Sequence, residues 1–380
     1  MKHYLLLPAL LLLALFATSH NKPNNNSTPT TITLNDNNKI SYNEIINSYR
    51  FVRLGATKTP VGEIEKTIIS DKYIILVDTE QAKTIFVFNH KGEIISEICR
   101  NGRGPQEYIF INDVALLDYK GQEAIAVADS QQEKLLLYNI KGEYITSFEF
   151  NFYFESIAQC GKSWLCTTSG DNDSSEAFKG RNDAKSLLVF TDNDMKIKSS
   201  ALPSPFVRED FVTPEIVTNG DMVAIMPKFH DTLYRVAEGQ ISPAYRFDIS
   251  AFGGVTKTDN WSTNELLKNF NNLVHIYGVR ETDNHIYIEV CKKESFIDNY
   301  IYNKNSGKSY RIKNGKGVAS LAEVMCYDFC ATYKDEFVAI TDAYEIAEFN
   351  EEYPDKAVFK DITDEDNPVI MFCTLKKKNF

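Results

Sequence analysis

Two stretches of the chain repeat one pattern of apolar and polar positions. KYIILVDTEQAKTIFVFNHKGEIISEI at 72–98 and EAIAVADSQQEKLLLYNIKGEYITSFEF at 123–150 each contain an apolar run, a polar turn, a second apolar run and an N-x-K-G-E turn. Asp78 in the first copy matches Asp129 in the second. Asn, Asp and Gly tolerate the positive φ angles that tight hairpins require. The two copies therefore predict hairpins that repeat with a period of about 50 residues.

Fainter copies of the hairpin follow along the chain. They lie at 186–200, 231–247 and 299–312, and further pairs of short strands precede hairpins at 155–170 and 274–290. Four strands per unit at this period are typical of a β-propeller blade. Counting the units gives six blades.

The ends of the chain indicate how the ring closes. The last unit, at 326–342 and 367–376, supplies three strands, whereas the strand at 49–54 precedes the first full unit without a partner. Pairing the two removes both open strand edges. We therefore expect an all-β fold, a six-bladed β-propeller of four-stranded antiparallel blades, in which an N-terminal strand closes the last blade. Residues 41–380 then form one domain.

Two insertions depart from the strand pattern. Residues 260–274 predict a helix, because Ser262 and Glu265 form an S-x-x-E capping box ahead of apolar residues with helical spacing. The apolar face of this helix would consist of Leu266, Phe270, Leu273 and Val274. The second insertion, 344–366, is rich in acidic residues, and we interpret it as a solvated excursion in preference to a metal site.

The N-terminus has the pattern of an export signal. A basic start precedes the apolar run 5–16, and Ala17-Thr18-Ser19 offers small residues for a signal peptidase. We expect residues 1–19 to be a removed signal peptide, the alternative being an uncleaved signal anchor, with no transmembrane segment after cleavage. The protein would then be periplasmic, on the cell surface or extracellular. His20 stands where a lipoprotein needs cysteine, so a lipid anchor is not expected.

Composition constrains the partners. The segment 20–40 is polar and rich in Asn, Pro and Thr, which predicts a disordered linker. The 380 residues are 43% hydrophobic, an ordinary globular composition, and carry a net charge of −11. Because acidic residues predominate, bulk electrostatics disfavours nucleic acid as a partner. We expect a monomer.

Four stretches spread over residues 48–378 carry a resemblance to a known family. They are RFVRLGATKTPVGEIEKTIISDKYIILVD, IFVFNHKGEIISEICRNGRGPQEY, FHDTLYRV and DEDNPVIMFCTLKK. In these stretches the chain resembles the exported six-bladed β-propeller family that is widespread in Bacteroidetes. The resemblance implies a lipoprotein or secreted propeller, and most members have no assigned biochemical function. The chain departs from the family at Gln106, where the loop more often has glycine, and in lacking the lipobox cysteine.

No motif of nucleophilic or phosphate chemistry is present in the sequence. It contains neither G-x-S-x-G nor H-E-x-x-H, and the two GKS triplets lack the upstream glycine of a P-loop. The seven cysteines form no CxxC pair, and most lie among apolar residues. We interpret them chiefly as small apolar residues in strands, with any disulfide pairing left open. No catalytic residue is assigned, which favours a protein that is not an enzyme.

Three aspartates end equivalent strands and raise the question of a metal. Asp78, Asp129 and Asp342 could form a carboxylate ring that holds calcium. The competing interpretation is that each aspartate caps the turn that follows it. We favour capping, so no metal ligands and no cofactor are assigned.

One face of a propeller gathers the connections between blades and those between the second and third strands, and ligands usually bind there or in the central channel. The stretch CRNGRGPQEY, residues 99–108, falls on that face as a chain-reversing corner. The candidate ligand-binding residues are Arg100, Arg103, Glu107 and His230. The first hypothesis is a binding or scaffolding module at the bacterial cell envelope for a glycan, peptide or partner protein. The alternative is a metal-assisted lactonase- or lyase-type enzyme that uses the channel.

Overall fold

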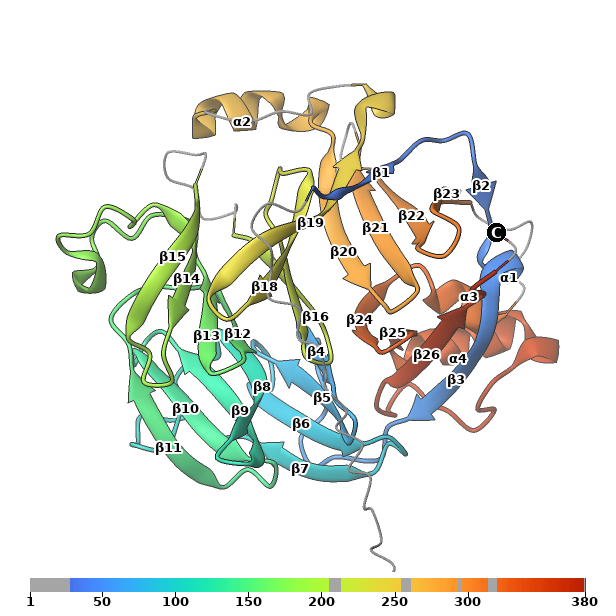
Figure 1. Ribbon diagram of the computed structural model, residues 1–380. Helices are drawn as coiled ribbons and strands as arrows, with labels where there is room; N and C mark the ends of the chain where they lie inside the picture. The colour runs from blue at the N-terminus through green and yellow to red at the C-terminus, as the bar shows by residue number, and fades with distance from the viewer. Residues whose placement is uncertain (1–27, 205–212, 254–260, 293–295, 314–319, 379) are drawn as a thin grey trace, which may run out of the picture.

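Six β-sheets surround a common centre in the computed structural model (Figure 1). The structure describes residues 28–204, 213–253, 261–292, 296–313, 320–378 and 380. The signal peptide predicted at 1–19 lies outside these residues. Each sheet contains a meander of four antiparallel strands, to which two sheets add a fifth, parallel strand, and first strands of neighbouring sheets contact one another at the centre of the ring. The predicted six-bladed propeller is confirmed.

The first three blades are continuous in the sequence. Blade 1 contains β4 (Lys66–Ile69), β5 (Tyr73–Asp78), β6 (Thr84–Asn89) and β7 (Ile94–Ile98). Blade 2 contains β8 (Asp113–Tyr119), β9 (Gln122–Asp129), β10 (Lys134–Asn139) and β11 (Tyr144–Glu149). Blade 3 contains β12 (Ser156–Cys160), β13 (Ser163–Thr167), β14 (Ser186–Thr191) and β15 (Ile197–Pro203).

The other three blades each receive a strand from the N-terminal segment. Blade 4 contains β16 (Glu215–Asn219), β17 (Met222–Met226), β18 (Thr232–Ala237) and β19 (Gln240–Asp248), with β1 (Thr30–Thr33) added in parallel to β19. Blade 5 contains β20 (His275–Glu281), β21 (His285–Cys291), β22 (Ile297–Asn303) and β23 (Lys308–Ile312), with β2 (Lys39–Ile40) parallel to β23. Blade 6 contains β24 (Phe329–Tyr333), β25 (Glu336–Thr341), β26 (Val369–Leu375) and, antiparallel to β26, β3 (Ile46–Arg53).

The pairing of β3 with β26 confirms that an N-terminal strand closes the last blade. The disordered linker predicted at 20–40 is wrong for β1 and β2, which lie within it. Their backbones bond to the open outer edges of blades 4 and 5, an interaction that polar composition does not reveal. Ile32 is 1% exposed, and the Asp36 carboxylate lies within 3.1 Å of the Lys292 ammonium.

Apolar side chains from the two faces of each sheet hold the ring together. Six hydrophobic clusters each join two neighbouring blades, the last of them linking blade 6 to blade 1 through residues such as Phe372 and Phe86. Central strands such as β5 and β10 are buried on both faces, which explains their unbroken apolar runs. The ring is thus a closed series of interfaces between sheets.

The helices are short and lie in connections between strands. They are α1 (Tyr42–Ile45), α2 (Thr263–Asn269), α3 (Leu321–Met325) and α4 (Ala343–Glu352), with 3-10 turns at Glu176–Phe178, Ser250–Phe252, Phe270–Asn272 and Pro354–Lys356. The capping box of α2 is confirmed, but Phe270 is 41% exposed and does not belong to its buried face. Helix α4 buries Ile346 and Phe349 against the core between blades 5 and 6, so the acidic insertion is docked rather than fully solvated. No helix in the described part of the chain has the length and apolarity to cross a membrane.

Candidate functional site

One face of the ring collects two sets of connections between strands. The links from one blade to the next leave at the same end as the links between second and third strands, because successive strands are antiparallel. We call this end the loop face. Its described residues lie in 54–65, 79–83, 99–112, 130–133, 150–155, 168–185, 204, 213–214, 227–231, 249–253, 261–274, 292, 296, 313, 320–328 and 342–368, and in the ends of the strands that these connections join.

The corner between blades 1 and 2 is fastened by Tyr108. Its ring is fully buried, and its hydroxyl oxygen lies 2.8 Å from the carbonyl oxygens of both Lys83 and Ile98. The same oxygen accepts a hydrogen bond from the Arg100 backbone N–H at 3.2 Å. Burial raises the pKa of Tyr108 well above its ordinary value, so the hydroxyl stays protonated. The expected chain-reversing corner is therefore built around one tyrosine.

Glu107 fills the interior of this corner. Its carboxylate accepts a hydrogen bond from the Gly104 backbone N–H at 2.8 Å. It occupies the space that a Cβ on Gly102 would need, which explains the glycine there. The Gln132 side chain donates to the Glu107 carbonyl oxygen at 2.8 Å. Glu107 thus has structural partners within the loop.

The structure does not gather the four predicted ligand-binding residues into one site. The exposed Arg100 donates its guanidinium to the Gly142 carbonyl oxygen at 3.2 Å, and Arg103 is exposed. His230 is half-buried in the turn between β17 and β18 of blade 4, whereas the other three lie between blades 1 and 2. None of the four lines the cavity at the centre of the ring.

Two of the three aspartates at strand ends act as caps, whereas Asp342 precedes α4 without a side-chain hydrogen bond to the start of that helix. The Asp78 carboxylate accepts hydrogen bonds from the backbone N–H groups of Gln81 and Ala82, at 2.8 and 2.9 Å. Asp129 accepts equivalent bonds from the backbone N–H groups that follow it and also from Ile109, at 2.7 Å. Among the described residues, no three His, Cys, Asp or Glu side chains are grouped so that they could hold a metal ion. The capping interpretation accounts for Asp78 and Asp129.

A cavity of about 290 Å³ lies where the innermost strands of blades 1 to 4 begin. The first residues of β4, β8, β12 and β16 meet there. Lys66 and Asp113 form an ion pair at 2.7 Å, and the second Asp113 carboxylate oxygen accepts from the Ile157 backbone N–H. The cavity is lined by Glu65, Lys66, Val77, Thr79, Asn112, Asp113, Ser156, Glu215 and Ile216.

Glu215 connects this cavity to a deeper charged group. Its carboxylate is paired with the Arg280 guanidinium, which also donates to the Cys330 carbonyl oxygen at 3.2 Å. Glu289 approaches from β21 over Gly278, whose missing side chain leaves the room for it. Burial raises the pKa of Glu289, and the nearby Glu215 carboxylate adds to the rise. The channel is therefore polar and contains both signs of charge.

Sequence reasoning missed the cavity residues. Most of those that open first strands lie beside other polar residues, such as Glu65, Asn112 and Glu155, and nothing in the local sequence marks them. The only available signal was positional: Lys66, Asp113, Ser156 and Glu215 each open the first strand of a blade.

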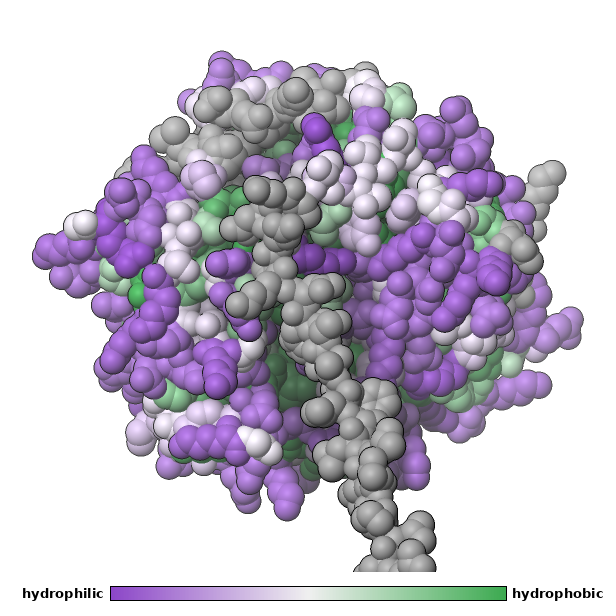
Figure 2. Space-filling model, in the orientation of Figure 1, coloured by the Kyte–Doolittle hydropathy of each residue, from purple (hydrophilic) through white to green (hydrophobic). Residues whose placement is uncertain are grey.

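Exposed apolar side chains gather on the loop face. Of the ten large hydrophobic residues that are exposed in the described part of the chain, eight lie in loop-face connections or among the first three residues of the strands that those connections lead into. The eight are Tyr153, Leu267, Phe270, Tyr277, Phe296, Ile297, Val324 and Tyr344. The other two, Tyr49 and Ile95, lie on the outermost strands of blades 6 and 1. In the orientation of Figure 2, hydrophilic residues cover much of the rim of the ring.

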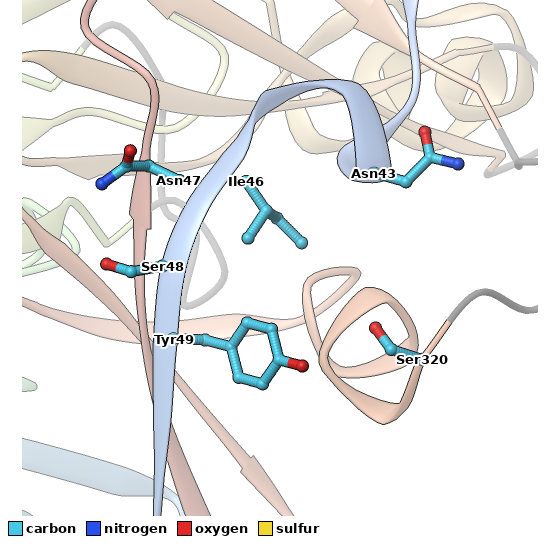
Figure 3. A pocket seen from close by; sticks show the side chains of 6 residues that line it. All are labelled: Asn43, Ile46, Asn47, Ser48, Tyr49 and Ser320. Atoms are coloured by element: carbon cyan, nitrogen blue, oxygen red, sulfur yellow. The ribbon is translucent and has the colours of Figure 1, made fainter. Parts of the chain in front are cut away.

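A second hollow lies outside the ring, against the edge strand β3. It measures about 460 Å³ and is lined by Asn43, Ile46, Asn47, Ser48, Tyr49 and Ser320. Figure 3 shows Ile46 and Tyr49 directed from β3 into the space beside the helix that follows Ser320. This hollow holds no charged side chain.

The ring of six sheets, each built on a four-stranded antiparallel meander, with a polar channel and a face of connections, defines a six-bladed β-propeller. Within that class, the chain belongs to the family described as "Domain of unknown function (DUF4934)", whose model matches residues 29–374. No curated protein matches the chain.

Two solved structures show the same fold. One is a Bacteroides fragilis protein described as "Putative exported protein", with a TM-score of 0.71, 19% identity, and coverage of 92% of this chain and 100% of that one. The other is a member of the DUF4221 family from Bacteroides vulgatus, with a TM-score of 0.51, 11% identity, and coverage of 88% and 98%.

Proposed function

We propose that the chain is an exported binding or scaffolding protein of the bacterial cell envelope whose loop face holds a glycan, a peptide or a partner protein. The observation that carries this proposal is the gathering of exposed apolar side chains on the loop face. Exposed apolar side chains that are concentrated on one face of a protein are typical of interaction sites, because covering them releases ordered water.

The polar cavity would give such a face its selectivity. The ion pairs that Lys66 makes with Asp113, and Arg280 with Glu215, balance four charges around it, and of the charged lining residues only Glu65 lies outside these pairs. A ligand entering the cavity would therefore be selected by hydrogen bonds rather than by net charge. Asn112, Thr79 and Ser156 carry the neutral polar groups at its lining.

Export is supported by the sequence pattern at residues 1–19. Cell fractionation of the native bacterium tests this part. We expect the protein in the periplasmic, outer-membrane or secreted fraction, and recovery with the cytoplasmic proteins would contradict export.

A pair of matched variants tests the loop face. One replaces Tyr153, Phe296 and Tyr344 by serine, and the control replaces Tyr49 and Ile95 by serine on the outer strands. The tyrosines of the two variants are matched, because Tyr49 is 47% exposed and Tyr153 is 49% exposed. Each protein is screened by thermal shift against glycans and peptides, since a ligand that binds only the folded state raises the melting temperature.

We expect ligands that raise the melting temperature of the unaltered protein to raise that of the outer-strand control equally, and to lose the effect on the loop-face variant. A ligand that stabilises the loop-face variant as strongly as the unaltered protein would place binding elsewhere. A loss of the effect in the control alone would point to the hollow beside β3.

A further inference from the structure

Two of the seven cysteines have their sulfur atoms in contact. Cys326 directly follows α3 as its C-terminal cap, Cys373 lies in β26, and their Sγ atoms are 3.9 Å apart. Both are fully buried in the apolar core between blades 5 and 6. The structure records all seven cysteines as free thiols, and the other five include the exposed Cys99. Burial as small apolar residues therefore describes most of the cysteines, but Cys326 and Cys373 also form a pair.

The two sulfur atoms need to move only a short distance to form a covalent bond. A disulfide has an S–S length of about 2.05 Å, and rotation of each side chain about its Cα–Cβ bond moves its sulfur along an arc of comparable size. The surrounding side chains are apolar and aromatic, including Tyr42 and Phe329. Cys326 lies in the connection between β23 and β24, outside the paired strands, so its sulfur can approach Cys373 without a change in strand pairing.

We propose that Cys326 and Cys373 are joined by a disulfide bond when the chain folds in an oxidising compartment. The proposal rests on the export part of the proposed function, and it is independent of the ligand. The bond would tie α3 to the strand that pairs with the N-terminal closing strand β3. The two cysteines are 47 positions apart, so the bond would restrict a long loop of the unfolded chain.

The bond forms by two thiol–disulfide exchanges with a disulfide donor, such as glutathione disulfide. The thiolate of one cysteine attacks a donor sulfur, the donor S–S bond breaks, and one glutathione thiolate leaves. The second cysteine thiolate attacks the resulting mixed disulfide and expels the other glutathione thiolate. Two protein thiols are oxidised, one donor disulfide is reduced to two thiols, and the two protons pass to the glutathione through solvent. Burial of both sulfurs places these steps before the last blade has packed.

Thiol counting by intact mass tests the proposal in two samples. The first is the full chain recovered from the exported fraction. The second is the chain purified under reducing conditions, unfolded, and refolded with glutathione and glutathione disulfide. Each sample is unfolded without reductant, and its free thiols are labelled with N-ethylmaleimide and counted. The labelling is then repeated on a second portion of each sample that has first been reduced.

We expect five labels on the seven cysteines before reduction and seven after it, with a linked peptide that contains Cys326 and Cys373. In Cys326→Ala all six remaining thiols should be labelled. The matched control Cys160→Ala, which removes another buried cysteine in blade 3, should keep the linked peptide.

Seven labels on both unreduced samples, or a linked peptide that joins other cysteines, would overturn the proposal. A bond in the refolded sample but not in the exported one would support the pairing and contradict passage through an oxidising compartment. The wild-type counts do not depend on whether any variant folds.

Discussion

The hydroxyl of Tyr108 offers the sharpest test of how the corner between blades 1 and 2 is held. Replacing Tyr108 by phenylalanine removes one oxygen and leaves the ring, which packs edge-on against Tyr138 with centroids 6.4 Å apart. The carbonyl oxygens of Lys83 and Ile98 then lose a donor, and the Arg100 N–H loses an acceptor. The hydroxyl has a single proton, which the two carbonyl oxygens share.

The expected cost follows from these partners. A buried polar group that is left without its hydrogen bond costs about 1–3 kcal/mol. Because three groups are affected and one proton served two of them, we expect Tyr108→Phe to lower the free energy of unfolding by roughly 2–4 kcal/mol. Tyr138→Phe is the matched control, because its hydroxyl makes one bond, to the Gln106 carbonyl oxygen at 2.9 Å. We expect it to cost about 1 kcal/mol.

Urea unfolding followed by tryptophan fluorescence and circular dichroism measures both variants against the unaltered protein, with a common slope used to convert midpoints into free energies. Coincident transitions by the two probes establish that the ring unfolds as one unit. If Tyr108→Phe costs no more than Tyr138→Phe, the three contacts of the Tyr108 hydroxyl do not stabilise the corner, and the argument is wrong.

Three further predictions concern other parts of the ring. Gly92→Ala should lower the free energy of unfolding by roughly 3 kcal/mol or more, because a Cβ there would lie 2.1 Å from the Arg53 carbonyl oxygen. Gly121→Ala is the control and should cost about 1 kcal/mol, because Gly121 has a similar positive φ but no atom within 4 Å of the added Cβ. Equal urea midpoints for the two variants would contradict this. Burial, with a smaller contribution from Lys228, lowers the pKa of His275 to about 4. The unfolded chain therefore binds a proton on the His275 imidazole at a higher pH than the folded chain does. The free energy of unfolding should have its full value above about pH 6.5 and fall by about 3 kcal/mol as the pH drops to 4. His275→Gln should show a correspondingly shallower decline, and an unchanged pH profile would refute the assignment. Removal of residues 1–56, which deletes β3, should abolish the cooperative melting transition. Removal of residues 1–40, which keeps β3, should only lower the melting temperature. Identical melting of the two truncated chains would show that β3 does not close the ring.

Local turn chemistry explains why the blades could be predicted from the sequence. In NHKGE the Asn89 side chain accepts hydrogen bonds from the backbone N–H groups of Lys91 and Glu93, and Gly92 has a φ of 83°. Asn139 makes the same bonds in NIKGE. These interactions span five residues, so the sequence displays them completely and fixes both hairpins.

The strands of the N-terminal segment could not be found in the same way. The polar β1 gains its hydrogen bonds from β19, more than 200 positions away, and its own residues show only a short alternation around Ile32. Asp36 is anchored in the same non-local manner, by Lys292, Arg311 and Tyr300. A composition-based prediction of disorder misses strands whose partners are supplied by an open sheet edge elsewhere.

The candidate site could not be predicted from local sequence either, because it is assembled from several blades of the closed ring. Lys66 belongs to blade 1 and its partner Asp113 to blade 2, whereas Glu215 of blade 4 pairs with Arg280 of blade 5. Each pair spans one interface between neighbouring blades, and the cavity brings together first strands of four blades. The N-terminal strand that completes blade 6 therefore also affects the geometry of the channel, because it holds the ring closed. We therefore expect a weakened closure to reduce ligand binding even where no ligand-contacting residue is changed. The exposed apolar side chains of the loop face are less constrained, because the connections that carry them can change without altering the strands beneath. Ligand specificity in such a ring can vary with the connections while the closure and the channel are preserved.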